Sequence, residues 1–272
     1  MTEIGIVEDT LFVPLIGRIH ASEHFPWILR DEKALELRKS LPARIFREDR
    51  QGEYTLVASA SRSAGMDRYV REFLELHPDG AVVELGCGLE TTFHRNDNGR
   101  TRWFAVDLPA VIAYRRTLLP ATERQTLIAG DAFDEGWIRA VRASLPDAPL
   151  LILASGLFYY FKEEEVLGLF HMLRGFGRIE IVLDAVSRIG LAMMRRKLMK
   201  DVRHADAEVY FHVDSARELA GRSGGTVEVI AEEPFYRSIS RRGLRLPTRL
   251  CMNISDRLRM VKMVHLRIRN CA

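Results

Sequence analysis

The stretch from Ala81 to Asp107 constrains the fold more than any other part of this 272-residue chain. It consists of an apolar run, a Gly86-Cys87-Gly88 turn, a segment of helical length, a second apolar run and an acid. This order predicts a β-α-β unit with the turn directly after the first strand. Because Gly86 and Gly88 lack a Cβ, a ligand can lie against the main chain there. Asp107 ends the second strand, where a carboxylate can accept hydrogen bonds from both ribose hydroxyls.

The number of glycines in this turn separates two classes of nucleoside cofactor. A dinucleotide site has a third glycine three residues after the second, and this chain has Thr91 there. Glu84 adds an acid at the strand tip, which would repel a diphosphate but tolerate a cation. The turn therefore favours S-adenosylmethionine, a sulfonium without phosphate, although Gly-x-Gly alone also occurs in ordinary tight turns. We interpret Cys87 as a small side chain packed under the cofactor rather than as a reactive thiol.

Composition limits the remaining possibilities. At 47% hydrophobic residues the chain can bury one sizeable α/β core. The longest apolar run, 149–161, is too short to span a bilayer, and the first residues lack the basic start of a signal peptide. Three cysteines without metal-ligand or disulfide spacing suit a reducing compartment. We expect a cytoplasmic protein with no metal and no membrane partner.

Charge is unevenly distributed along the chain. Residues 188–272 hold 18 basic and 9 acidic residues, a net +9, and residues 1–187 hold 22 and 28, a net −6. This asymmetry indicates an anionic partner near the C-terminal third, or a solvated basic face. Residues 187–200 form a basic amphipathic stretch, which we expect to be a lid whose Arg195, Arg196 and Lys197 attract an anion.

Residues 10–60 are expected to form short helices that cover a pocket mouth. They contain His20-Ala21-Ser22-Glu23-His24, which matches an inverted zinc-protease pattern, but no other part of the chain supplies a third ligand. The next predicted helix runs from Ser61 to His77 and places Arg62 at its start. There the guanidinium would lie near the glycine turn and could bind a carboxylate, or it is a surface charge.

Two further strand ends carry candidate site residues. Gln125–Ala129 is a predicted strand followed by Asp131 and Ala132, where the acid could accept from the exocyclic amine of adenine or cap a helix. The predicted strand Leu150–Ala154 is followed by a second candidate set. This set comprises Ser155, Gly156, Tyr159 and Tyr160.

In open α/β sheets the ligand crevice lies beyond the carboxyl ends of the strands, so residues 155–160 should line the reaction site. The two tyrosines could present π faces to a sulfonium and hydroxyls to a substrate, or they are core or hinge aromatics. Further elements are predicted along the rest of the chain, and residues 233–260 fit no predicted element. The predicted elements are helices at 109–119, 163–174 and 214–221 and strands at 179–183, 226–231 and 262–269, with Asp184 closing the first of these strands.

Three passages together resemble the leucine carboxyl methyltransferase family, which includes polyketide O-methyltransferases. They are residues 82–91 around the glycine turn, residues 106–109 with Arg115 and Arg116 beyond, and residues 155–161. The resemblance implies a Rossmann-like class I methyltransferase fold, with a seven-stranded, mostly parallel sheet whose last strand is antiparallel. We expect a single α/β domain, with a helical cap at 1–60, a cofactor-binding core at 61–184, and a lid and C-terminal strands at 185–272.

The resemblance also implies roles for individual residues. Arg62 would hold the methionine carboxylate, Gly86 and Gly88 would cradle the cofactor, Asp107 would bind ribose and Asp131 the adenine end. We place Leu108, beside Asp107, in the same site. The family usually has Glu at the position of Ser155, so any contact made by that acid is missing here.

The expected activity is methyl transfer to a carboxylate or acidic hydroxyl of an anionic small molecule in secondary metabolism, with Tyr159 and Tyr160 at the reaction centre. Such a transfer depends mainly on alignment. A neutral hydroxyl acceptor would require a base, for which His204 and His212 are the candidates. Alternatives are a methyltransferase for a protein C-terminal carboxylate, a nucleic-acid methyltransferase, which would normally carry an Asn/Asp-Pro-Pro-aromatic strand end, and a non-catalytic cofactor-binding protein. The sequence does not determine the oligomeric state.

Overall fold

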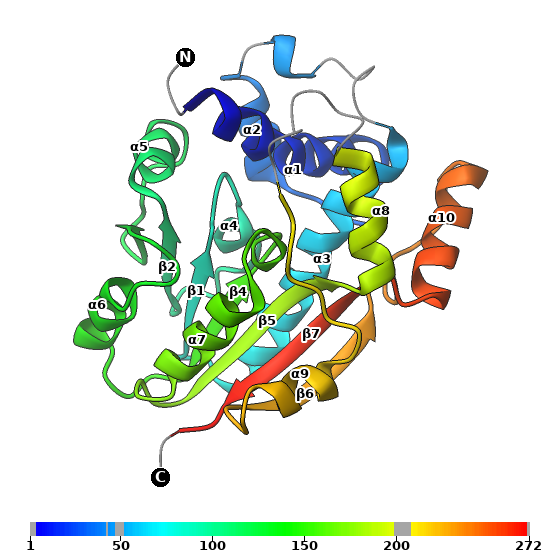
Figure 1. The fold of residues 1–272 in the computed structure, drawn as a ribbon. Helices are drawn as coiled ribbons and strands as arrows, with labels where there is room; N and C mark the ends of the chain where they lie inside the picture. Colours follow the sequence, from blue (N-terminus) through cyan, green and yellow to red (C-terminus); the bar gives the residue numbers. More distant parts are fainter. Residues whose placement is uncertain (1–3, 42, 47–51, 199–207, 271–272) are drawn as a thin grey trace.

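A computed structural model describes residues 4–41, 43–46, 52–198 and 208–270 (Figure 1). Its centre is one seven-stranded sheet in the order β3-β2-β1-β4-β5-β7-β6. The strands are β1 (Ala81–Leu85), β2 (Arg102–Asp107), β3 (Gln125–Ala129), β4 (Leu150–Ala154), β5 (Ile179–Val186), β6 (Val227–Pro234) and β7 (Val261–Ile268). Strands β1 to β5 pair in parallel, and β7 runs antiparallel to both β5 and β6. The predicted mostly parallel sheet with an antiparallel last strand is confirmed.

Strand order places the crevice between β1 and β4. The chain builds β2 and β3 on one side of β1 and then returns to build β4 and β5 on the other side. The loops that leave β1 and β4 therefore diverge, which is where open α/β sheets bind ligands.

Alternation along the strands separates two packed faces. Val83 and Ile152 are aligned neighbours that face a core shared with α6 (Gly136–Ser144), α7 (Glu163–Leu173) and α9 (Ala216–Arg222). Val82 and Leu151 face the opposite core, with α3 (Glu53–Leu76), α4 (Thr92–Asn96) and α10 (Leu246–Arg257). Helix α5 (Pro109–Leu118) covers β2 and β3, and α8 (Arg188–Leu198) follows β5 (Figure 1). None of the helices in these described ranges is long and apolar enough to cross a membrane.

The N-terminal cap consists of α1 (Ile4–His24), α2 (Glu32–Arg38) and the 3-10 helix η1 (Ala43–Phe46). The expectation of short helices is wrong for α1, which has 21 residues and contains Pro14. Gly17 lets α1 cross α3 closely, because a Cβ there would lie 2.6 Å from the Cβ of Ser59. The cap packs on the core through Leu15 of α1, which shares a buried cluster with Leu89 beyond the glycine turn.

Two element boundaries differ from the prediction near the site. Helix α3 begins at Glu53 rather than Ser61, because no helix breaker intervenes and Leu56 and Val57 continue its buried face. Arg62 therefore lies within the helix and not at its start. Strand β5 continues to Val186, since residues beyond Leu183 still pair with β7, and Asp184 is buried inside the strand.

The segment 233–260, which fitted no predicted element, contains the end of β6 and helix α10. Pro247 lies in the first turn of α10, a position where proline's missing N–H leaves no helical hydrogen bond unmade. Gly243 precedes the helix with a φ of +75°, a backbone angle that favours glycine.

A buried ion network fastens the cap to the core. Asp31 caps α2 through an acceptor contact with the Ala34 amide at 2.9 Å, and its Oδ2 accepts from Arg18 Nε at 3.1 Å and Arg95 Nη1 at 2.6 Å. Arg95 also donates two hydrogen bonds to Asp67 of α3, at 2.7 and 2.9 Å. Burial alone would raise the pKa of Asp31, but the two guanidinium groups hold it below its usual value. Arg18 extends the network to the glycine turn by donating to the carbonyl of Leu89 at 2.7 Å.

Replacing the shared carboxylate should destabilise the whole protein. Asp31→Asn keeps the size of the side chain but leaves two buried guanidinium groups without their common anion, so we expect the free energy of unfolding at pH 7 to fall by about 3–5 kcal/mol. Because the pKa of Asp31 is lowered on folding, its contribution is present above about pH 4 and is lost as the pH falls through the folded pKa. Urea titrations at neutral and acidic pH should show that the difference in free energy of unfolding between wild type and Asp31→Asn becomes smaller as the pH falls.

Glu36→Gln is the matched control, since it removes an exposed partner of Lys33 on the same helix and should have little effect. Equal stability of the Asp31 and Glu36 variants at pH 7 would contradict this account of the network.

Candidate functional site

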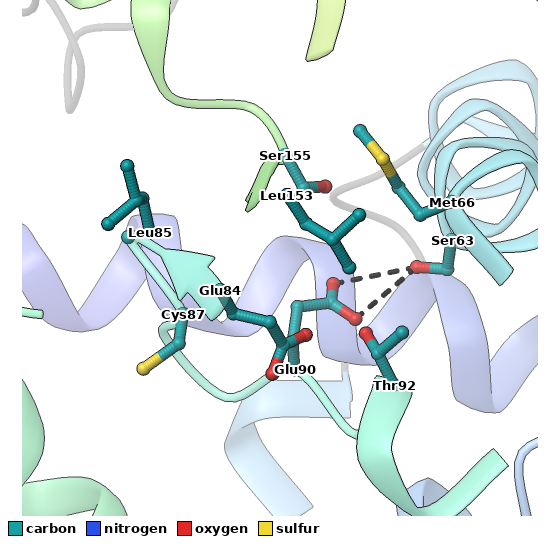
Figure 2. Close-up of a pocket in the computed structure, with 10 residues that line it drawn as sticks. Ser63, Met66, Glu84, Leu85, Cys87, Glu90, Thr92, Leu153 and Ser155 are labelled. Atoms are coloured by element: carbon teal, nitrogen blue, oxygen red, sulfur yellow. Dashed lines mark hydrogen bonds between the residues drawn. The ribbon is translucent and has the colours of Figure 1, made fainter. Parts of the chain in front are cut away.

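A small pocket opens at the carboxyl ends of β1 and β4, where the strand order placed the crevice (Figure 2). It is bounded by the ends of these strands, the loop after β1 and one face of α3. Its lining residues are Ser63, Met66, Glu84, Leu85, Gly86, Cys87, Glu90, Thr92, Leu153 and Ser155. Of the residues predicted from sequence, the pocket brings together Glu84, Gly86, Cys87 and Ser155.

The glycine turn has the backbone that the sequence predicted. Gly86 and Gly88 have φ angles of +63° and +45°. A Cβ on Gly86 would lie 2.8 Å from a methyl carbon of Leu157, so a side chain at this position would both strain the backbone and clash. The turn therefore presents main-chain atoms rather than side chains to the pocket.

Asp107 fixes the turn and retains capacity to bind a ligand. It ends β2, and its Oδ2 accepts from the Gly88 amide at 2.8 Å while its Oδ1 accepts from the Leu108 amide at 2.8 Å. Burial raises the pKa of this carboxyl, and the two amides oppose that rise. Each carboxylate oxygen can accept more than one hydrogen bond, so a pair of hydroxyls can still bind. The Leu108 side chain is half exposed beside it.

Two carboxylates with different partners face the pocket. Glu84 is buried and accepts from Trp103 Nε1 at 2.9 Å, and burial raises the pKa of this carboxyl. Glu90 accepts from the Ser63 hydroxyl at 3.5 Å (Figure 2). It also pairs with Arg18 of the cap. Acids and hydroxyls together favour a cationic group, such as the ammonium or sulfonium of S-adenosylmethionine, over a phosphate. The residues present therefore fit this cofactor.

Arg62 reaches the end of β4. Its Nε donates to Asp184 Oδ2 at 2.9 Å, and its Nη2 donates to the Tyr159 hydroxyl at 3.2 Å. The other oxygen of Asp184 accepts from the Gly156 amide at 2.6 Å. A Cβ on Gly156 would lie 2.9 Å from Arg62 Nη1, so the absence of a side chain lets the guanidinium lie against the main chain.

Asp184 is the site residue that sequence reasoning missed. We predicted it as the residue that closes a strand and assigned it no role. The available signal was an acid inside an otherwise apolar run, because a buried carboxylate in such a run requires a partner. Here the partner is Arg62.

The two tyrosines differ in environment. Tyr159 lies in the 3-10 helix η3 (Phe158–Tyr160) and is 6% exposed, with its ring packed against Val186, Leu191 and Val209. Burial raises the pKa of its hydroxyl, although Arg62 acts in the opposite direction. Tyr160 is 38% exposed. Of the two, Tyr160 has the more accessible ring.

The end of β3 lies next to the end of β2, as the Gly130 amide donates to the Asp107 carbonyl at 2.9 Å. Asp131 is exposed, and its Oδ1 accepts from the Phe133 amide at 2.9 Å. The Ala132 carbonyl accepts from Trp137 Nε1 at 3.0 Å. Asp131 therefore stabilises its own loop, and its second carboxylate oxygen forms no hydrogen bond to another described residue.

Below the turn, Cys87 is buried with Ala105 and Ile112, and burial raises the pKa of its thiol far above the usual range. This confirms the interpretation of a packed side chain. Arg115 of α5 is fully buried beside it and donates to the Gly88 carbonyl at 2.8 Å. Two nitrogens of its guanidinium have no hydrogen-bond partner among the described residues. Arg115 thus supports the turn at the same glycine whose amide binds Asp107.

The two histidines of the rejected zinc pattern lie one turn apart on α1. Their rings stack with centroids 4.4 Å apart, and within the described parts of the chain no three His, Cys, Asp or Glu side chains form a group that could hold a metal ion.

Comparison with known proteins gives consistent results. The family model for leucine carboxyl methyltransferase matches residues 3–174, which is more than half of the chain. The polyketide O-methyltransferase TcmP of tetracenomycin synthesis in Streptomyces glaucescens is 29% identical over 223 residues, covering 80% of each chain. The S-adenosyl-L-methionine-dependent methyltransferase dpfgK of Gibberella zeae is 27% identical over 233 residues, covering 78% of this chain and 77% of that protein.

Solved structures extend the likeness of fold over most of the chain. A putative methyltransferase from Thermobifida fusca superimposes with a TM-score of 0.56 at 16% identity, covering 93% of this chain and 94% of the other. A DUF574 family protein from Streptomyces avermitilis gives 0.56 at 13% identity, with 93% and 96% covered. At such identities these two structures support the fold alone. By its sequence match, this chain belongs to the leucine carboxyl methyltransferase family and is an S-adenosylmethionine-dependent methyltransferase.

Proposed function

We propose that this enzyme transfers a methyl group to an oxygen of an anionic small molecule that carries a carboxylate or an acidic hydroxyl. The observation that carries the proposal is the state of Tyr159, whose hydroxyl lies beside Gly156. Its oxygen is bound to Arg62, and its raised pKa keeps it protonated at neutral pH. A group that stays protonated cannot accept a proton from the acceptor. An acceptor that arrives ionised needs no such base.

The cofactor would lie across the glycine turn, held by the three strand ends. In this proposal Asp107 binds the ribose hydroxyls, with Leu108 beside it, and Asp131 and Ala132 border the adenine end. Arg62 binds the methionine carboxylate through the part of its guanidinium that faces away from Asp184. Glu84 and Glu90 flank the methionine ammonium.

The reaction would then proceed with little help from proton transfer. The ionised acceptor oxygen attacks the methyl carbon, a C–O bond forms as the S–CH₃ bond breaks, and the sulfur keeps the electron pair as a neutral thioether. Alignment of the attacking oxygen supplies most of the rate. Ser155, Tyr160 and the lid helix α8 border the side from which the acceptor would approach.

A neutral hydroxyl acceptor would require another base. His212 lies on the segment that follows the lid, with its Nε2 4.0 Å from Asp214, and is about one-third exposed. His204, the other predicted candidate, lies outside the described residues. We favour the ionised acceptor because it needs neither residue.

A small-molecule acceptor also agrees with the role of the relative TcmP in polyketide synthesis. Several arginines of the basic C-terminal third have their charge balanced by carboxylates of the same chain, which weakens the argument for a nucleic-acid substrate. These ion pairs are Arg237 with Glu233, Arg241 with Asp256 and Arg245 with Glu53.

Loss of the Asp107 charge should weaken every adenosine ligand. Hydrogen bonds to charged groups contribute about 1.5–3 kcal/mol each, so Asp107→Asn should raise the Kd for S-adenosylhomocysteine and for methylthioadenosine by about tenfold to hundredfold. Isothermal titration calorimetry measures both. Asp134→Asn, at an exposed loop acid, is the control. Unchanged affinity of the Asp107 variant for both ligands would refute its role at the ribose.

Arg62 and Asp184 should affect only ligands that carry the amino-acid end. Arg62→Met should raise the Kd for S-adenosylhomocysteine at least about tenfold and leave methylthioadenosine, which lacks the carboxylate, unchanged. Asp184→Asn should act in the same direction but less strongly, because it misplaces the guanidinium without removing it. Arg68→Met is the matched control, a similarly half-buried arginine on the same helix that pairs with Glu72 and Glu233 instead of Asp184.

Equal weakening of the two ligands by Arg62→Met, with the fold intact by circular dichroism, would mean that Arg62 does not bind the carboxylate. An Asp184→Asn effect confined to thermal stability would reduce Asp184 to a structural residue.

The product bond and the pH dependence test the acceptor class. With methyl-labelled cofactor and a panel of aromatic carboxylic acids and phenols, we expect a carboxylic acid or acidic phenol to be methylated, and kcat/KM to stay nearly constant from pH 6 to 9. Tyr159→Phe should keep that flat profile, since the tyrosine is protonated throughout. Release of labelled methanol by alkali distinguishes an ester from an ether. A rate that rises about tenfold per pH unit and then levels off would instead indicate a general base on the enzyme.

A further inference from the structure

Helix α10 carries a stripe of large apolar residues on its solvent-facing side. A helix that only packs on the core of its own domain would carry such a stripe on its buried side. Thr248, Met252 and Ser255 face the protein. Four large aliphatic residues point to solvent, each 44–74% exposed, and they recur every four residues. They are Leu246, Leu250, Ile254 and, at the C-cap, Leu258. At about 100° per residue they fall within about one-third of the circumference, opposite the buried side.

This stripe is surrounded by positive charge. Residues 237–260 contain seven arginines and one acid, Asp256, which is paired with Arg241. Arg249, Arg257 and Arg259 are exposed and form no ion pair within the described parts of the chain. An apolar stripe bordered by unpaired arginines is typical of a helix that lies on an anionic surface.

The exposed apolar surface continues onto the lid helix. The end of α10 adjoins the start of α8, where the Ser187 amide donates to the Met260 carbonyl at 2.9 Å. Ile189 and Met193 of α8 are 55% and 57% exposed. The two helices lie near each other at one edge of the molecule, with α10 outermost (Figure 1). The patch, comprising Ile189, Met193, Leu246, Leu250, Ile254 and Leu258, therefore spans two helices.

Charge argues against a second copy of this chain as the partner. A two-fold contact along α10 would bring its arginines against the same arginines of the other copy, and like charges across an interface are costly. A partner protein would need a groove whose shape matches a ridge formed by two helices. A bilayer surface needs no such matching, and its anionic headgroups would pair with the free guanidinium groups.

We propose that the α8–α10 patch docks the enzyme reversibly on an anionic lipid membrane. Leucine and isoleucine side chains of α10 enter the boundary between headgroups and acyl chains, and Arg249 and Arg257 bind lipid phosphates. This contact replaces the expectation of no membrane partner, which rested on the absence of a spanning run. A helix lying in the plane of the surface needs no spanning length.

Vesicle flotation of the full chain tests the proposal directly. The probes are large unilamellar vesicles of phosphatidylcholine alone and of phosphatidylcholine mixed equally with phosphatidylglycerol, at about 0.1 M salt, where the Debye length is about 10 Å. Wild type should float with the anionic vesicles and not with the neutral ones. Arg249→Gln with Arg257→Gln should weaken that partition by about 30-fold, since each arginine near the surface contributes about fivefold. Leu250→Gln with Ile254→Gln should weaken it by about tenfold or more.

Leu76→Gln with Arg100→Gln is the matched control, because both are exposed residues far from α10 in the sequence, and it should bind as wild type does. All changes lie on solvent-facing side chains, and circular dichroism checks that each variant is folded. Absence of wild-type binding to anionic vesicles, or equal binding by the α10 variants, overturns the proposal. A concentration-dependent dimer in sedimentation velocity that the Leu250 and Ile254 changes abolish, without vesicle binding, would assign the patch to a second copy instead.

Discussion

The positions of the N-terminal cap and of the loop after β1 depend on the carboxylate of Asp31. One of its oxygens is shared by Arg18 of the first helix and Arg95 of the helix after the glycine turn. Both guanidinium groups are almost fully buried, and although each has a second carboxylate partner, Glu90 for Arg18 and Asp67 for Arg95, Asp31 is the anion that they share. Through Arg18 the same network holds the Leu89 carbonyl and Glu90. Besides packing on the core, the cap therefore fixes the loop that forms one wall of the pocket.

From there the positions of the other site groups follow. The glycine turn is held between the cap on one side and Asp107 and Arg115 on the other. The end of β4 is held by Asp184, which binds the Gly156 amide and Arg62 with its two oxygens. In the proposed site Arg62 would bind the cofactor carboxylate, and Asp184 orients its guanidinium and balances part of its charge. Two buried carboxylates thus position these arginines: Asp31 positions Arg18 and Arg95, and Asp184 positions Arg62.

Much of this arrangement is predictable from local sequence. Strands β1 to β4 begin and end where apolar runs meet turn residues, and the glycine turn has the backbone angles that its two glycines permit. The resemblance to a methyltransferase family implied the seven-stranded, mostly parallel sheet with its antiparallel last strand, whereas the order of the strands became known only from the structure. The position of Arg62 was less predictable, because its helix begins eight residues earlier than the apolar period alone indicated. Polar residues such as Tyr54 and Thr55 carry no sign that tertiary packing continues the helix.

Long-range pairs were beyond prediction. Arg62 and Asp184 are 122 residues apart, and Asp31 and Arg95 are 64 apart, so no local pattern links them. The periodicity of α10 also does not reveal that its apolar stripe faces solvent, because a stripe of leucines indicates a buried face unless the neighbouring elements are known. In each case the sequence shows the residue types but not which residues they contact in the fold.

We infer that these buried carboxylates prepare a site for S-adenosylmethionine at the ends of β1, β2 and β4. A crystal structure of the protein with S-adenosylhomocysteine tests this inference. We expect the ribose hydroxyls on Asp107, the ligand carboxylate on Arg62 with its Asp184 contact intact, and the thioether above Gly86. A ligand whose amino-acid end lies away from Arg62, or whose ribose does not contact Asp107, would contradict it.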